Sequence, residues 1–178
     1  TPGDVAGRIV WAFAESDGIT HAASEDGAAL TSGNAGATWS ASPPLTHRAL
    51  RAITASSSGV HVGSDGSGVF RLRDGDGAWR QTGLTNTIVM SLSGGAARSY
   101  AVSGFNGVLV TTDSGDSWTR TNAGLTRFEI WAMLRTEAVM YAGTGGEGVF
   151  ASYDDGATWK PTGLRDRNVR ALARHGAA

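Results

Sequence analysis

Tryptophan returns at a nearly constant interval in this 178-residue chain, and this repeat limits the possible folds more than any other feature. The intervals between the four repeated tryptophans are 40, 39 and 41 residues. The four residues are Trp39, Trp79, Trp118 and Trp159. A period of about 40 residues is typical of β-propellers and of some solenoids, in which one repeat cannot bury its apolar face without its neighbours. We therefore expect four copies of one supersecondary unit.

A short polar motif ends at each of these tryptophans, with the form Ser/Thr-x-Asp/Asn-x-Gly-x-Ser/Thr-Trp. The Asp or Asn side chain can accept hydrogen bonds from the backbone of a turn, and the Gly can adopt a backbone angle that a Cβ disfavours. We interpret the motif residues as structural turn residues, not as catalytic acids. They are Ser32, Asn34, Gly36 and Trp39, then Asp74 and Trp79, then Asp113, Gly115 and Trp118, and finally Asp154, Gly156 and Trp159. The second copy keeps the Asp and the Trp but lacks the hydroxyl residues.

Three further features recur in the same phase as the motif. An apolar strand with small residues at alternate positions comes first, and a second strand with one ring side chain follows it. The ring side chains are His21, His61, Tyr100 and Tyr141. A segment of the type Gly-Val-Phe then opens the strand that leads into the motif. The repeating unit is therefore four short strands with a motif hairpin between the third and the fourth.

Four strands in each repeat predict an all-β propeller with one four-stranded blade per repeat. The content of 26 Gly and only 4 Pro fits an all-β chain with frequent tight turns. A solenoid is the structural alternative, but four strands joined by hairpin turns favour radial packing. We expect a single domain over residues 1–178, with blades at about 8–47, 48–87, 88–128 and 129–167.

A fifth copy of the first strand follows the fourth blade, at residues 168–175. Closed propellers avoid unpaired sheet edges, so this extra copy needs an explanation. Three arrangements remain open at this point. Four blades close and one strand copy pairs elsewhere, or two chains form a homodimeric ring of about eight blades around a two-fold axis, or the sequence is an excised part of a longer propeller.

These motifs resemble the Asp-box, or bacterial-neuraminidase-repeat, superfamily of β-propellers over essentially the whole chain. The stretch 141–164, with Tyr-Ala-Gly-Thr, Gly-Val-Phe, Asp-Asp-Gly-Ala-Thr-Trp-Lys and Gly-Leu, is most similar to three groups within it. They are the xyloglucanase-type glycoside hydrolases, the sortilin-like propellers and the photosystem II assembly-factor-like propellers. The resemblance implies the fold specifically, but it implies little about activity, because these groups include hydrolases, receptors and assembly factors.

Two departures from the superfamily bear on enzyme activity. Sialidases with similar motifs need an arginine triad, a Tyr nucleophile and an Asp acid, and no sequence context here assigns them. Xyloglucanase-type enzymes carry two large propellers with one catalytic acid on each, which four repeats do not supply within one chain. A glycoside hydrolase, or half of one completed by a second subunit, is therefore the alternative to a binding function.

The variable position of the first strand provides the leading candidates for a ligand site. Its occupants in the five copies are Trp11, Arg51, Met90, Trp131 and Arg170. Where this position borders the central channel, Trp and Arg suit a ligand with flat apolar faces and an anionic or hydroxyl-rich edge. The alternative is packing between blades, with the Arg stems extending outward.

The turns between the second and third strands provide a second set of candidates, because binding residues concentrate on loops at one face of a ring. Phe105 and Asn106 are ligand candidates in this set, and Glu25 and Glu147 are candidate acid and base residues of a glycosidase. The ring side chains of the second strand are expected to pack between blades. With Tyr at two of the four positions, they do not predict a zinc site.

Charge and composition restrict the partners. The net charge is −1, from 15 basic and 16 acidic residues, so nucleic acid is not an expected partner. No cysteine is present, and no apolar stretch reaches the length of a membrane helix. No phosphate-binding motif, metal site or cofactor is predicted. From the start at Thr1 we expect a processed form or an excised piece of an exported protein, extracellular or periplasmic.

The function predicted from the sequence is a non-catalytic binding or assembly module that recognises a glycan or a protein partner at one face of the propeller. Besides the glycoside hydrolase, a structural or engineered repeat scaffold without a ligand remains as a second alternative.

Overall fold

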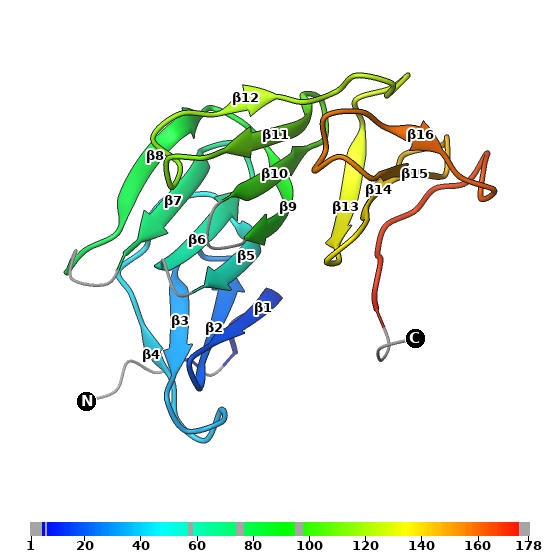
Figure 1. Cartoon of the computed structure of the whole chain (residues 1–178). Helices are drawn as coiled ribbons and strands as arrows, with labels where there is room; N and C mark the ends of the chain where they lie inside the picture. The colour runs from blue at the N-terminus through cyan, green and yellow to red at the C-terminus, as the bar shows by residue number, and fades with distance from the viewer. Residues whose placement is uncertain (1–4, 6, 57–58, 74–76, 95–97, 175–178) are drawn as a thin grey trace.

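The computed structural model describes residue 5 and residues 7–56, 59–73, 77–94 and 98–174. Sixteen strands in this part of the chain form four antiparallel sheets of four strands, and each sheet uses consecutive strands in chain order. Figure 1 shows the four sheets following one another along an arc, from blue to orange. The prediction of an all-β propeller with four four-stranded blades is confirmed.

Each blade begins with an inner strand of six or seven residues, and the outer strand has two residues in blades 1, 3 and 4 but six in blade 2. Blade 1 contains β1 (Val10–Ser16), β2 (Ile19–Ser24), β3 (Ala29–Ser32) and β4 (Ser40–Ala41). Blade 2 contains β5 (Leu50–Ser56), β6 (Gly59–Ser64), β7 (Gly68–Leu72) and β8 (Arg80–Thr85). Blade 3 contains β9 (Val89–Gly94), β10 (Ser99–Ser103), β11 (Gly107–Thr111) and β12 (Thr119–Arg120). Blade 4 contains β13 (Ile130–Arg135), β14 (Met140–Thr144), β15 (Val149–Ser152) and β16 (Lys160–Pro161).

Consecutive blades pack face to face, so the apolar core lies in layers between them. The first strands pack in series, β1 against β5, β5 against β9 and β9 against β13. One face of each blade carries large side chains, such as the cross-strand row of Ile53, Val62 and Phe70 in blade 2. The other face carries small residues, and a Cβ added to Gly63 would lie 2.4 Å from Cγ1 of Val89. This alternation of large and small faces allows neighbouring blades to approach closely.

The motif hairpins lie between the third and fourth strands, as the repeat predicts. In blade 4 the Ser152 hydroxyl accepts a hydrogen bond from the Gly156 N–H at 2.8 Å, and Asp154 accepts one from the Thr158 N–H at 2.8 Å. Gly156 has φ +83°, which a Cβ would disfavour. The same bonds recur around Asn34 and Asp113, while Asp74 lies outside the described residues. In three blades, therefore, the Asp or Asn of the motif binds the turn that holds it.

Acidification tests this turn. Hydrogen bonds from the Thr158 hydroxyl, the Thr158 N–H and the Ser152 hydroxyl lower the pKa of Asp154 from 3.8 to about 2. Equivalent bonds, that from the Ser117 hydroxyl foremost, lower the pKa of Asp113. A carboxyl with a lowered folded-state pKa stabilises the fold above its unfolded-state pKa, and this contribution disappears as the pH falls from about 4 towards 2. We expect the melting temperature followed by circular dichroism to fall in this window.

The chain offers a matched control for this prediction. Asn34 makes the same backbone bond to Thr38 in blade 1 and also donates to the Thr38 hydroxyl, both at 2.9 Å. The double variant Asp113→Asn, Asp154→Asn should therefore fold and should show a smaller fall in melting temperature between about pH 4 and 2. Identical pH profiles for the variant and the parent protein would contradict the assignment.

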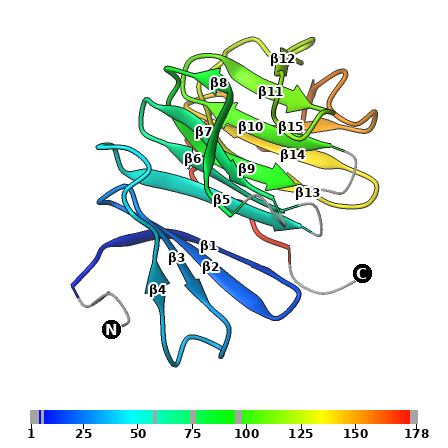
Figure 2. The same cartoon turned by 90° about the vertical axis from the view of Figure 1, so that its left-hand side faces the viewer.

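The predicted fifth first-strand copy is not a strand in this structure. Residues 169–174 form no β-structure, and Asn168 makes only an isolated antiparallel bridge with Gly145. The reason is that no second strand follows to pair with this segment within the described residues. The segment is drawn in red in Figures 1 and 2, and Figure 1 shows it descending from blade 4, with a gap between it and β1.

Candidate functional site

The first strands of all four blades meet at one inner cavity of about 400 Å³. The C-terminal segment contributes Arg170, Ala171 and Leu172 to the same cavity. The variable first-strand residues line it together, and they are Trp11, Arg51, Met90, Trp131 and Arg170. They converge here because the first strand is the innermost strand of each blade. The structure thus brings together the leading candidates from the sequence.

Two arginines stack on two tryptophans at this cavity, and both pairs join neighbouring repeats. The Arg51 guanidinium lies 5.2 Å from the ring centre of Trp11, and that of Arg170 lies 4.2 Å from the ring centre of Trp131. A guanidinium over an indole face is attracted by the ring quadrupole. Arg51 also makes an ion pair with Asp65 at 2.7 Å. Trp11 remains 49% exposed, so the pair of Trp11 and Arg51 is open to a ligand from solvent.

Arg170 differs from Arg51 in its charge environment. It is exposed, and the described residues show no carboxylate within ion-pair distance of its guanidinium. The fifteen residues that line the cavity include no Asp or Glu. The cavity therefore presents one neutralised and one uncompensated arginine beside aromatic surface. Sequence reasoning did not predict the Arg–Trp stacking or the Asp65 ion pair, although Trp preceding Arg in successive repeats was the available signal.

The loop candidates are held by contacts of their own. The Thr126 hydroxyl donates to the Glu147 carboxylate, and Arg127 lies 3.5 Å from it. Asn106 accepts a hydrogen bond from Arg120 at 2.6 Å, while Phe105 is 76% exposed.

Glu25 is exposed, and the structure shows no contact between it and Glu147. Neither glutamate lines the inner cavity. The structure therefore gives no support to Glu25 and Glu147 as the carboxylate pair that a glycosidase needs.

Two ring side chains of the second strand, His61 and Tyr100, lie between blades. His61 Nε2 donates to the Ser114 carbonyl at 3.2 Å, and the Tyr100 hydroxyl donates to the Asp155 carbonyl at 3.0 Å. Both carbonyls belong to the motif hairpin of the following blade. Burial is the main cause that lowers the pKa of His61, so its imidazole stays neutral near pH 7. His61 and Tyr100 therefore connect neighbouring blades through hydrogen bonds, and they do not face a common cavity.

Another cavity, of about 460 Å³, lies between blades 1 and 2 and is bordered by His21, Thr31 and Arg73. We assign this cavity no role. Within the described residues, no group of three or more His, Cys, Asp or Glu side chains is placed to hold a metal ion. The same part of the chain contains no helix with the length and apolarity to cross a membrane.

No protein-family profile matches this sequence, and no curated protein sequence matches it either. Solved structures do match. The computationally designed Ika4 protein is 14% identical with a TM-score of 0.68, over 84% of this chain and 94% of that chain. YCF48 bound to D1 peptide is 11% identical with a TM-score of 0.70, over 86% of this chain and 53% of that chain.

The Niastella koreensis GH74 enzyme is also similar, at 20% identity and a TM-score of 0.64. The match covers 83% of this chain but only 23% of that enzyme. The chain thus spans a part of two larger propeller proteins and nearly the whole of a designed one. At these identities the likeness concerns the fold. The chain has the β-propeller fold, which it shares with the GH74 enzyme, with YCF48 and with the computationally designed Ika4 protein.

Proposed function

We propose that this chain is a non-catalytic binding module that recognises a glycan or a protein partner at its inner cavity. The observation that carries the proposal is the convergence of two Arg–Trp pairs on one cavity. Aromatic side chains supply flat apolar contact area, and the guanidinium supplies up to five fixed donors for anionic or hydroxyl-rich groups. The matching ligand has a flat apolar face and an acidic or polar edge.

The position of Arg170 supports this ligand chemistry. Its guanidinium is held over Trp131 at 4.2 Å, so the charge is oriented before a ligand arrives. An oriented arginine loses less conformational freedom on binding than a free one. Arg51, by contrast, already shares its charge with Asp65. We therefore expect Arg170 to contact the anionic edge of the ligand and the tryptophans to contact its apolar face.

Tryptophan fluorescence provides the test. Neutral oligosaccharides, uronic-acid oligosaccharides and short acidic peptides that contain aromatic residues should be titrated separately into the full chain. We expect one class to change the emission of the indoles, and Trp131→Ala or Arg170→Ala to weaken that class about 10-fold or more, equal to about 1.4 kcal/mol. The class that binds decides between a glycan and a protein partner.

Arg165→Ala is the matched control, because it removes the same charge from the same end of the chain. Arg165 bonds the Thr162 carbonyl and does not line the cavity. The Arg165→Ala variant should bind the ligand with the same affinity as the parent protein. Equal losses in Arg165→Ala and Arg170→Ala would show a general charge effect and would contradict a cavity site.

A scaffold without a ligand is the second candidate, and the likeness to a computationally designed protein favours it. It predicts no change in fluorescence with any of the three ligand classes. A glycoside hydrolase has less support than either candidate, since the cavity lining contains no carboxylate.

A further inference from the structure

The C-terminal segment, residues 167–174, occupies the place of a first strand against blade 4. The Gly148 N–H donates to the Arg167 carbonyl at 2.9 Å, as the Gly68 N–H donates to the Thr87 carbonyl at 3.0 Å where blade 3 begins. The Val169 N–H donates to the Thr144 carbonyl at 2.9 Å. The backbone of the C-terminal segment is thus hydrogen-bonded to blade 4 in the same way as the backbone before β9 is hydrogen-bonded to blade 2.

Side-chain packing repeats this equivalence. A Cβ added to Gly143 of β14 would lie 2.7 Å from Cγ1 of Val169, and one added to Gly63 would lie 2.4 Å from Cγ1 of Val89. Val169 therefore fills the space that the missing Cβ of Gly143 leaves on blade 4, and we call this space the glycine notch. Val10 holds the same position in β1 as Val89 and Val169 hold in their own repeats. The notch of blade 4 is thus built for the first strand of a following blade.

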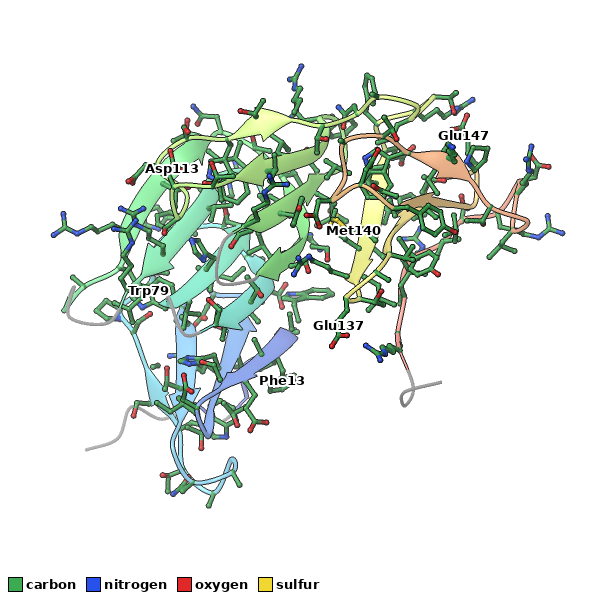
Figure 3. The ribbon with its side chains drawn as sticks, in the orientation of Figure 1. Phe13, Trp79, Asp113, Glu137, Met140 and Glu147 are labelled. Atoms are coloured by element: carbon green, nitrogen blue, oxygen red, sulfur yellow. The ribbon has the colours of Figure 1, made fainter. Side chains whose placement is uncertain are left out.

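The opposite end of the arc has an uncovered face. Phe13 of β1 is 63% exposed, whereas its equivalents in blades 2, 3 and 4 are 6%, 9% and 8% exposed. Those equivalents are Ile53, Leu92 and Met133. The Phe13 ring lies beside that of Trp39, with ring centres 6.3 Å apart, and Figure 3 shows Phe13 at the free side of blade 1. Blade 1 therefore carries the large-residue face of a blade without a preceding blade to cover it.

We infer that a second copy of this chain closes the arc. Blade 1 of each copy packs on blade 4 of the other, around a two-fold axis that makes the two junctions identical. A second copy fits because the two faces are complementary. The uncovered large-residue face belongs to blade 1, and the glycine-notched face that fits it belongs to blade 4. Phe13 is 63% exposed, and Figure 1 shows a gap between β1 and the C-terminal segment, so these faces do not meet within one chain.

The C-terminal segment competes with this assembly, because it occupies the notch that β1 of the second copy needs. β1 pairs with β2 over six residue pairs and packs on blade 2, whereas the C-terminal segment forms no strand. Displacement of the C-terminal segment is therefore the easier change. On association Val10 of the partner copy replaces Val169 beside Gly143, and the segment leaves the ring together with Arg170. The inner cavity is then lined by the first strands of both copies. The ligand site proposed above, in which Arg170 lies over Trp131, therefore belongs to the monomer.

Light scattering and sedimentation velocity over a concentration series test the inference. The parent chain, of 18.3 kDa, should shift towards twice that mass as the concentration rises. Val169→Asp should release the C-terminal segment and lower the dimer dissociation constant about 10-fold. Phe13→Asp should keep the protein monomeric, and Phe13→Asp combined with Val169→Asp should also be monomeric. A Val169→Asp protein that stays monomeric at all concentrations would overturn the inference.

A second pair of variants keeps the test independent of the folding of any one protein. Truncation after Asp166 removes the C-terminal segment and should promote dimers as Val169→Asp does. Gly143→Asp places a charged side chain in the notch, where an added Cβ already lies 2.7 Å from Val169, and should prevent dimers. Circular dichroism checks that each variant is folded. Dimers that persist in folded Gly143→Asp or Phe13→Asp would place the interface elsewhere and overturn the inference.

Discussion

Trp159→Ala is expected to lower the free energy of unfolding by about 3–5 kcal/mol, as is typical for a fully buried aromatic residue. Trp159 is 2% exposed and packs in the core between blades 3 and 4. Its indole N–H donates to the Thr121 carbonyl at 2.8 Å, so the change leaves a buried acceptor without its partner as well as a cavity. Urea denaturation followed by circular dichroism measures the loss.

The repeat itself supplies the control. Trp39 holds the same motif position in blade 1, but it is only half-buried, because the described residues form no blade on that side of the molecule. Trp39→Ala should cost no more than about 1–2 kcal/mol. Equal losses at the two positions would mean that both indoles are buried alike in solution, and this outcome would also contradict the open face of blade 1 in the monomer.

The blades could be predicted from the sequence because their signals are local and repeated. The motif tryptophans fix the period, and the Asp or Asn with Gly fixes the hairpin, since its hydrogen bonds span only two to four residues, as in Ser152–Thr158. The inner position of the first strand followed from its small alternate residues. This local chemistry does not depend on how many blades complete the ring.

The site could be predicted only in part. The variable first-strand position was identified, but stacking of Arg170 on Trp131 depends on the exposure and orientation of side chains from two repeats. The acid and base hypothesis for Glu25 and Glu147 needed a distance across the ring, which periodicity does not contain. The fate of the fifth strand copy was likewise left open, because strand formation requires a pairing partner that the sequence pattern alone does not place.

Gly68→Ala is expected to destabilise the fold about as much as Trp159→Ala, through backbone geometry alone. Gly68 has φ +87°, and a Cβ at this position would lie 2.0 Å from the Leu84 carbonyl oxygen. The unfavourable φ costs about 1–3 kcal/mol, and the overlap adds about 1–3 kcal/mol because a backbone carbonyl cannot rotate away as a side chain can. Urea denaturation should therefore show a loss of about 2–6 kcal/mol.

Gly66→Ala separates these two causes, because Gly66 lies in the same turn with φ +109° but has no atom within 4 Å of the added Cβ. It should show the backbone cost alone, about 1–3 kcal/mol. The difference between the two variants then measures how tightly β7 approaches the end of β8. A Gly68→Ala protein as stable as Gly66→Ala would mean that this approach is looser in solution, and the close contact between the third and fourth strands of blade 2 would have to be revised.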